Sequence, residues 1–234
     1  MNFDLTEEQE EFRQAVRDFA VEVIGPRAEE MDRKEELPMD IVKQMAEMGL
    51  FGLPFPEKYG GQGADFLTLC LAIEEIARVD SSMAITLEAA VGLGANPIHH
   101  YGTEEQKEQW LAPMCRGEIL GAFGLTEPGG GSDAAATKTT ARLEGGEWVI
   151  NGSKAFITNS GTPISKVATI TAVTGEADGR KEISSIIVPT DTPGFEVGRS
   201  YRKVGWRASD THELAFNDCR VPEQNLLGEK GKGY

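Results

Sequence analysis

A run of three glycines followed by a serine is the part of this sequence best suited to hold an anion or a flat heterocycle. Residues 123–133 read FGLTEPGGGSD, so Gly129 to Gly131 precede Ser132. Glycines leave backbone amides open to a ligand, because no side chain blocks the approach. Glycines alone are equally typical of a plain surface loop. The segment is therefore a candidate binding loop whose ligand must be argued from other residues.

Two familiar phosphate-binding patterns do not describe this loop. Gly129, Gly131 and Ala134 fit the G-x-G-x-x-A spacing of a dinucleotide-binding turn. Such a turn leads into a helix and then a parallel strand, whereas here Glu127-Pro128 delays the turn and hairpin-like residues follow. The loop also lacks the lysine of a P-loop. We expect neither fold.

The other reactive residues form no recognisable metal or redox motif. The cysteines lie far apart, at Cys70, Cys115 and Cys219. They predict separate reduced thiols instead of a paired site. The histidines His99, His100 and His212 lack a ligand partner at useful spacing, so we interpret them as structural and expect no metal.

A small basic cluster stands out in an acidic chain. It consists of Arg199, Arg202, Lys203 and Arg207. These side chains could meet phosphates of a cofactor or substrate, or balance nearby acidic residues, and the sequence favours neither.

The front of the chain predicts helices. Thr6 with Gln9 forms a capping box, a second box starts at Thr103, and each predicts that a helix begins there. Apolar residues recur at helical spacing, and the first stretch is interrupted at Gly25-Pro26. We expect an all-helical domain over residues 1–118.

The back of the chain predicts β structure. Asn151-Gly152 separates two strand-like runs within residues 147–158, and Asn-Gly is the strongest short-range hairpin signal. Further strands are expected at residues 166–173, 183–189 and 212–217. The fold class is α+β, with an antiparallel β sandwich or partly closed barrel over residues 119–225 and a linker starting at residues 226–234.

Composition excludes several classes of protein. The net charge is −15 and the acidic residues are scattered, so nucleic acid is not an expected partner. The first residues have no basic flank with an apolar stretch behind it, and no apolar run approaches the roughly 18 to 20 residues that cross a bilayer. We expect a cytoplasmic protein with no membrane contact.

Four linked stretches resemble the acyl-CoA dehydrogenase family. They are residues 125–133 (LTEPGGGSD), residues 150–159 (INGSKAFITN), residues 203–211 (KVGWRASDT) and the loop at residues 56–63 (PEKYGGQG). Their order and spacing match the family, and together they cover essentially the whole chain. The resemblance implies a flavoprotein with FAD as its cofactor.

The resemblance also implies which residues meet the flavin. Main-chain groups near Leu125 and Thr126 would hydrogen-bond the pyrimidine side of the ring, beside Phe123 and Gly131. Ser132 would lie where the FAD pyrophosphate and the substrate's CoA meet, and so could bind either.

A second stretch would complete the flavin site. Phe156, Ile157 and Thr158 would place a ring against one flavin face and a hydroxyl near N5. The family often has Tyr at the position of Phe123 and Trp at that of Phe156, so this chain keeps the aromatic surface and loses a polar hydrogen bond.

The implied reaction removes a Cα proton and a Cβ hydride from an acyl-CoA thioester, giving a trans-2-enoyl-CoA. Members take the essential Glu from a C-terminal helical domain that this sequence lacks, so we expect no catalytic residue here and no activity of these 234 residues alone. Electron-transferring flavoprotein is the expected acceptor, and a homotetramer the expected assembly of the full-length protein.

Two carboxylates need separate interpretations. Glu88 lies in a nearly all-apolar helix, where a carboxylate is costly unless it is paired or faces a cavity. We interpret it either as a substrate-binding residue that marks the depth of the acyl pocket or as a satisfied buried group. Glu127 is expected to anchor the glycine loop through its own hydrogen bonds.

Two other functions remain open from sequence. An oxidase or monooxygenase of the same fold would let reduced flavin react with oxygen. A non-catalytic module would bind flavin or acyl-CoA without turnover.

Overall fold

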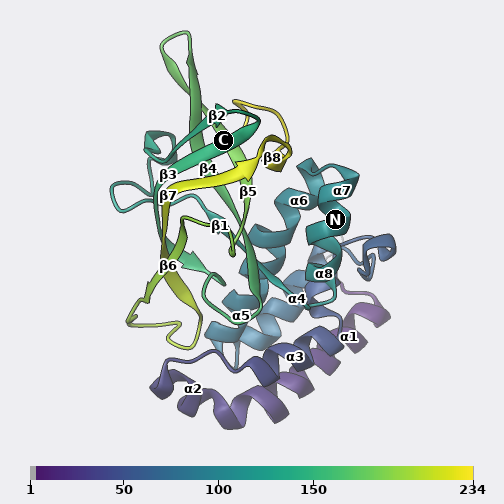
Figure 1. Cartoon of the computed structure of the whole chain (residues 1–234). Helices are drawn as coiled ribbons and strands as arrows, with labels where there is room; N and C mark the ends of the chain where they lie inside the picture. The colour runs from purple at the N-terminus through teal and green to yellow at the C-terminus, as the bar shows by residue number, and fades with distance from the viewer. Residues whose placement is uncertain (1–3, 234) are drawn as a thin grey trace.

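The computed structural model describes residues 4–233 as a helical part followed by a β part (Figure 1). The α-helices are α1 Glu7–Phe19, α2 Ala28–Lys34, α3 Met39–Glu47, α4 Phe66–Ala77, α5 Ser81–Glu88, α6 Asn96–Tyr101, α7 Glu104–Gln106 and α8 Ala112–Cys115. Both predicted capping boxes are confirmed, because Thr6 and Thr103 each accept from the amide three residues later. Beyond the end of α3, Gly49 adopts a left-handed backbone conformation with φ 74°.

Three prolines lie inside longer helical runs instead of ending them. Each follows a π-helical turn by two residues: Ala20–Ile24 precedes Pro26, Ala89–Ala95 precedes Pro97, and Lys107–Leu111 precedes Pro113. A proline ring collides with the carbonyl four residues earlier, and in all three cases that residue lies in the wider π turn. The predicted interruption at Gly25-Pro26 is therefore wrong. The first helical run continues through a 3₁₀ turn at Gly25–Arg27 into α2.

The β part is one connected eight-stranded sheet. Its strands are β1 Leu120–Gly124, β2 Thr140–Glu144, β3 Glu147–Thr158, β4 Ser165–Ala177, β5 Arg180–Pro189, β6 Phe195–Ser200, β7 Thr211–Pro222 and β8 Leu226–Leu227. The order is β6-β7-β3-β2-β4-β5-β8, with β1 also pairing with β4. Most pairs are antiparallel as predicted, but β1 runs parallel to β4, and so does β2 through the pair Thr140 and Val173.

The predicted hairpin at Asn151-Gly152 is wrong. Both residues lie inside β3, and the turn between β2 and β3 is formed by Gly145 and Gly146 instead. Gly152 serves another purpose, since a Cβ there would come within 2.5 Å of Thr139 Oγ1. The glycine lets the chain that enters β2 lie unusually close beside β3, with a bulge in the β3–β7 pairing next to it.

The two parts share a hydrophobic core. The cluster that fills the helical part also includes Leu120, Val167 and Ile187, which come from β1, β4 and β5. A second cluster lies within the sheet around Trp148, Ile170 and Phe216. The helices are therefore packed on the sheet through buried apolar side chains, and residues at their junction have fixed relative positions.

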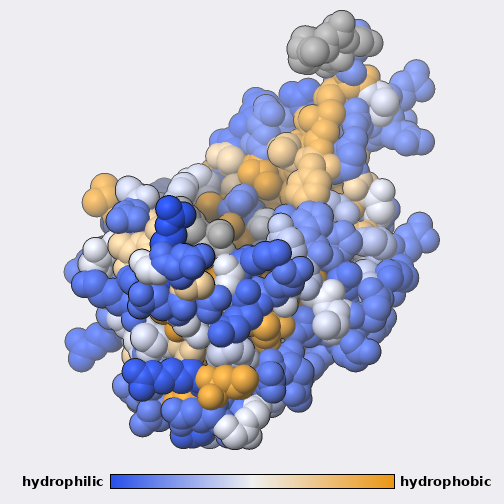
Figure 2. Space-filling view, turned by 90° about the horizontal axis from the view of Figure 1, so that it is seen from above, coloured by the Kyte–Doolittle hydropathy of each residue, from blue (hydrophilic) through white to orange (hydrophobic). Residues whose placement is uncertain are grey.

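The surface agrees with the acidic composition. Seen from above, it is largely hydrophilic, and hydrophobic residues gather in separate patches (Figure 2). Within residues 4–233, no helix is long and apolar enough to cross a membrane.

Candidate functional site

A pocket of about 240 Å³ lies where the two predicted flavin stretches meet. Its lining consists of Ala89, Leu93, Phe123, Leu125, Thr126, Phe156, Ile157 and Thr158. Six of these eight residues were predicted from sequence as cofactor contacts. They come from β1 and the segment after it, and from the end of β3, so the intervening residues 127–155 lie outside the pocket lining.

The pocket offers hydrogen-bond donors that the protein itself leaves free. Among the described residues, no hydrogen bond uses the amide N–H of Leu125 or Thr126, or the hydroxyl of Thr126 or Thr158. The rest of the lining is apolar or aromatic. A mostly apolar pocket with a few convergent donors is the usual form of a small-molecule or cofactor site, and donors here favour a ligand with acceptor atoms.

A buried ion pair holds in place the segment of Leu125 and Thr126, which forms the polar wall of the pocket. Glu127 and Lys154 are 8% and 0% exposed, and Lys154 Nζ lies 2.9 Å from Glu127 Oε1. Lys154 Nζ also donates to the carbonyl of Leu125 at 3.2 Å. The side chain thereby fixes the main chain at Leu125, a residue that lines the pocket.

Glu127 closes the base of the glycine loop, as predicted. Its carboxylate accepts from the amides of Lys138 at 2.7 Å and Thr139 at 3.0 Å, beyond the far end of the loop. Burial raises the pKa of Glu127, but the hydrogen bonds from Lys154 and Thr139 outweigh it and lower the pKa to about 2. The carboxylate is therefore charged at neutral pH and anchors both ends of residues 127–139.

Phe156 forms the aromatic wall in a strained conformation. Its φ is 60°, in the left-handed region that bulky residues avoid, and its side chain is 63% exposed. The Tyr201 ring lies against it at 4.6 Å between centroids with planes 32° apart. Tyr201 thus braces Phe156 toward the pocket.

The opposite wall is the π-helical segment Ala89–Ala95, which supplies Ala89 and Leu93. It lies directly on β1: a Cβ at Gly94 would come within 2.5 Å of the Gly121 carbonyl oxygen. Only glycine allows the helix to approach the strand so closely. π turns are frequent at functional sites, because they shift the face that a helix presents.

Three predicted residues do not line the pocket. Gly131 and Ser132 lie exposed in the glycine loop, although a Cβ at Gly131 would be in ordinary contact, 3.4 Å from Thr126 Cγ2. Glu88 is half-buried one residue before Ala89, and burial raises its pKa. A ligand reaching beyond the pocket would have to meet these residues, so their assignments stay predictions.

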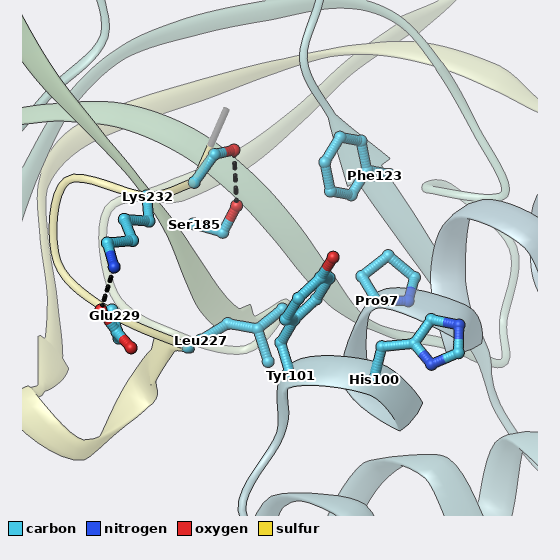
Figure 3. A pocket seen from close by; sticks show the side chains of 10 residues that line it. Pro97, His100, Tyr101, Phe123, Ser185, Leu227, Glu229 and Lys232 are labelled. Carbon is cyan, nitrogen blue, oxygen red and sulfur yellow. Dashed lines mark hydrogen bonds and ion pairs between the residues drawn. The ribbon is translucent and has the colours of Figure 1, made fainter.

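A larger hollow of about 540 Å³ adjoins the pocket and shares Phe123 with it (Figure 3). Pro97, His100 and Tyr101 of α6 face Leu227 and the turn that follows β8 (Figure 3). Its charged groups are used within the turn, where Lys232 Nζ lies 2.7 Å from Glu229 Oε2. Neither sequence stretch contributes to it except through Phe123, so the smaller pocket is the candidate site.

The basic cluster is largely occupied by acidic neighbours. Arg207 donates to Glu35 Oε1 at 2.7 Å, and Arg202 lies 3.6 Å from the same oxygen. Lys203 donates to the carbonyl of Ser209 at 2.7 Å. Of the two interpretations left open, charge balance describes Arg202 and Arg207, whereas Lys203 is bonded to a main-chain carbonyl. Arg199 forms no ion pair with any residue of the described chain.

His212 contacts two polar neighbours, whereas the interpretation of His99 and His100 as structural stays a prediction. His212 lies 2.9 Å from Asp210 Oδ1 and 2.8 Å from the carbonyl of Gly198. Within residues 4–233, no three His, Cys, Asp or Glu side chains gather in a way that could hold a metal ion. The three cysteines are free.

Sequence reasoning placed the helix of Glu88 at the acyl pocket but named neither Ala89 nor Leu93, and it missed the residues behind the pocket. Ala89 and Leu93 carry no chemical signal, and Tyr201 is a lone aromatic residue outside the recognised stretches. Lys154 lies within a recognised stretch, yet nothing local shows that it is buried. Its only hint was Glu127, a second charge in an otherwise apolar and glycine-rich context.

Taken together, a helical domain packed on a β domain, with a donor-lined pocket at their junction, define a two-domain ligand-binding unit. Comparison with known proteins shows that residues 6–118 match the acyl-CoA dehydrogenase N-terminal domain and residues 122–219 its middle domain. The chain therefore belongs to the acyl-CoA dehydrogenase family, whose members are flavoproteins that use FAD.

Individual relatives agree over the whole chain. A probable acyl-CoA dehydrogenase, YngJ of Bacillus subtilis (strain 168), is 49% identical over 100% of this chain and 61% of its own length. The structure of butyryl-CoA dehydrogenase from Megasphaera elsdenii is 42% identical with a TM-score of 0.94, covering 100% of this chain and 61% of that one. An acyl-CoA dehydrogenase from Bacillus anthracis in complex with FAD is 38% identical with a TM-score of 0.89, covering 98% and 39%. The chain thus spans about 61% of the length of curated relatives such as YngJ.

Proposed function

We propose that this chain is the FAD-holding part of an acyl-CoA dehydrogenase that converts a short acyl-CoA thioester to the trans-2-enoyl-CoA. The observation that carries the proposal is the set of unused donors at Leu125, Thr126 and Thr158 around an apolar pocket. The ring of FAD is flat, mostly apolar and edged with acceptor atoms, so the residues present fit it. FAD supplies the hydride acceptor for this reaction.

The polar wall has a specific electrostatic task in this proposal. The amides of Leu125 and Thr126 would face the pyrimidine edge of the ring, where negative charge accumulates on reduction. Fixed donors stabilise such charge without reorganising, and Lys154 keeps them fixed through the Leu125 carbonyl. The Thr158 hydroxyl would lie beside N5. These residues therefore bind, orient and tune the cofactor.

Phe156 and the helix wall would keep the reacting face dry. Phe156 covers one side of the pocket, and Ala89 and Leu93 line the other. Exclusion of water matters because the Cα proton of a thioester is removed only when the carboxylate base and the carbonyl are poorly solvated.

We place the catalytic base outside the described residues. The eight lining residues include no titratable side chain. Glu127, the nearest carboxylate in the motif, is held charged by Lys154 with a pKa of about 2, which makes it a poor proton acceptor. The known relatives are longer than this chain, so they have room for a base elsewhere. We propose that residues 1–234 alone bind without turnover.

Substrate length is proposed from relatives and from Glu88. The similar enzyme from Megasphaera elsdenii acts on butyryl-CoA, which favours a short acyl chain. Glu88 lies next to Ala89 on the helix wall, and its pKa is raised by burial. A carboxyl there would end the apolar path, so Glu88→Ala in the full-length enzyme should shift preference toward longer thioesters. Unchanged preference would remove Glu88 from the substrate site.

Electron-transferring flavoprotein is the proposed acceptor, and a homotetramer is the proposed assembly of the full-length protein. An oxidase of the same fold is distinguished by oxygen. The flavin of a dehydrogenase, once reduced by substrate, should reoxidise slowly in air and quickly with an acceptor flavoprotein.

The decisive experiment is anaerobic addition of butyryl-, octanoyl- and isovaleryl-CoA to the FAD-loaded full-length protein, followed by flavin absorbance. We expect butyryl-CoA to bleach the flavin, and residues 1–234 loaded with FAD to stay yellow. Thr158→Val should weaken FAD binding about fivefold, the value of one hydrogen bond. Thr140→Val, on a different part of the sheet, is the matched control.

The outcomes separate the candidates. Bleaching by a thioester supports a dehydrogenase, and the effective thioester defines its substrate class. Bound FAD that no thioester reduces would leave the non-catalytic module. Failure of the full-length protein to retain FAD would overturn the proposal.

A further inference from the structure

Two anchors join the walls of the flavin pocket, one at each end. At one end, Gly94 of the helix wall lies directly on Gly121 of β1. At the other end, Asn159, which follows β3, donates from Nδ2 to the carbonyl of Thr86 on α5 at 3.0 Å. The pocket residues Ala89 and Leu93 lie between residues 86 and 94, so both are held between the anchors.

The placement of Asn159 is unusually constrained. Its side chain is 0% exposed and its φ is 59°, a left-handed conformation that asparagine tolerates better than most residues. Its amide donates to Asp210 and its carbonyl accepts from Ser165, so the main chain is fixed as well. Within the described chain, its Oδ1 atom has no hydrogen-bond partner. Only the donor half of the side-chain amide is used.

The partner of Asn159 is the main-chain carbonyl of Thr86, about one helical turn before the pocket residue Ala89. Thr86, Ala89 and Leu93 are spaced by three and four residues, which places them on one helical face. On the sheet side, Asn159 directly follows Phe156, Ile157 and Thr158 of the opposite wall. One buried hydrogen bond therefore links the residue that directly follows β3 to the helical turn that precedes the helix wall.

We propose that Asn159 is a positioning residue that sets the spacing between the two walls of the pocket. It would act through Thr86 and the helix, without touching the cofactor. Loss of its donor would remove the anchor at Thr86 and leave the helix wall held by the contact at Gly94 and by the buried side chains of Ala90, Val91 and Ala95. The wall would then open at the Ala89 end, next to Thr158. The consequence for FAD rests on the proposed function, whereas the consequence for the helix does not.

The test compares Asn159→Gly with Asn151→Gly in the full-length protein. Glycine at 159 keeps the left-handed backbone and removes the hydrogen bond. Asn151 is an exposed residue of β3, the strand that Asn159 follows. It exchanges two hydrogen bonds with Asp218, outside the pocket lining, so it is a matched control. Should Asn159→Gly fail to fold by circular dichroism, Asn159→Ser shortens the side chain and replaces it.

Two measurements are made on each variant. Amide hydrogen exchange of the FAD-free protein should be about fivefold or more faster over residues 86–93 in Asn159→Gly than in the control, since the lost contact is worth about one hydrogen bond. FAD affinity, followed by flavin fluorescence, should fall about five- to tenfold in Asn159→Gly alone.

The results discriminate the positioning role from simple stability. Asn159→Gly with a lower melting temperature but unchanged exchange over residues 86–93 and unchanged FAD affinity would overturn the inference. A second result is faster amide exchange over residues 86–93 in Asn159→Gly together with an unmutated protein that does not bind FAD. This result would support the spacing role and reject the proposed function. The two ideas can therefore fail separately.

Discussion

Arg17 on α1 grips the carboxylate of Glu75 on α4 with two hydrogen bonds, from Nε to Oε2 at 2.9 Å and from Nη2 to Oε1 at 2.8 Å. Arg13 donates to Oε1 as well, at 2.8 Å. The Glu75 side chain is 1% exposed, so this bidentate contact ties the first helix to the core of the helical domain.

This contact predicts acid sensitivity. Hydrogen bonds from Arg17 lower the pKa of Glu75 from 4.5 to about 2. Because the pKa of Glu75 is lower in the folded state, its ionised carboxylate stabilises the fold fully above about pH 4.5. This stabilisation is lost as pH falls toward 2. Glu75→Gln should lose about 1–3 kcal/mol at pH 7, since the arginines remain partly solvated, and should show a weaker loss between pH 5 and 2. Urea unfolding at each pH measures both.

Glu104→Gln is the control for that experiment. Hydrogen bonds from Tyr59 and Lys58 also lower the pKa of Glu104 to about 2, but its side chain is 63% exposed. Water screens this pair, so its removal should change the acid dependence far less. Equal effects of the two variants would show that burial of Glu75 is not what matters.

Lys154 and Glu127 should respond asymmetrically to substitution. Lys154→Met leaves a buried carboxylate without its cation and should cost about 3–5 kcal/mol in urea unfolding. Lys154→Met combined with Glu127→Leu removes both charges and should recover part of that loss. FAD binding should stay weak in the double variant, because the carbonyl of Leu125 and the amides of residues 138 and 139 lose their partners. Additive losses in the double variant would contradict a coupled pair.

Alanine substitutions at Gly152 and Gly145 distinguish the steric cost of a new Cβ from the conformational cost of a left-handed backbone. A Cβ at Gly152, where φ is 147°, would meet Thr139 Oγ1 at 2.5 Å and Thr139 Cα at 2.7 Å. A Cβ at Gly145, where φ is 63°, meets nothing within 4 Å. Gly145→Ala should therefore cost about 1 kcal/mol, the price of the backbone alone, and Gly152→Ala clearly more. Equal melting temperatures for the two variants would refute the close approach of Thr139 to Gly152.

The cysteines should differ sharply toward a thiol reagent. Burial raises the pKa of Cys115 to about 12 and that of Cys219 to about 11, whereas Cys70 is exposed. Only the thiolate reacts, so one thiol per chain should react quickly with Ellman's reagent in native buffer and all three in urea. Cys70→Ser should abolish the fast phase. A fast phase that persists would mean that Cys115 or Cys219 opens to solvent.

Local signals predicted the helix starts well. A capping box contains its own evidence, because Thr6 and Gln9 satisfy each other's main chain within one turn. The recognised stretches likewise predicted six pocket residues, since each stretch is short and contiguous. Interactions between residues that are close together in the chain can therefore be predicted from sequence.

Features set by distant contacts could not be predicted in this way. Asn151-Gly152 has the composition of a turn. In the fold, Thr139 lies close against Gly152, and strand β3 continues through both residues. Lys154 is polar in sequence and fully buried in the fold, because Glu127 lies 27 residues earlier along the chain and beside it in space. The helix wall depends on Gly94 lying on Gly121, which no local pattern shows.

The pairing of each π turn with a proline two residues later has a consequence for rotation. An α-helix turns by 100° per residue, so one additional residue in a turn rotates everything beyond it by about that angle. In the run from Ser81 to Tyr101, the amide of Asn96 bonds back five residues to Val91 and marks this change of phase. Ala89 and Leu93 face the smaller pocket from within the π turn, while His100 and Tyr101 beyond it face the larger hollow. Because of the π turn before Pro97, one helical run lines two adjoining cavities. Deleting a single residue from Ala89–Ala95 would rotate His100 and Tyr101 away from the larger hollow.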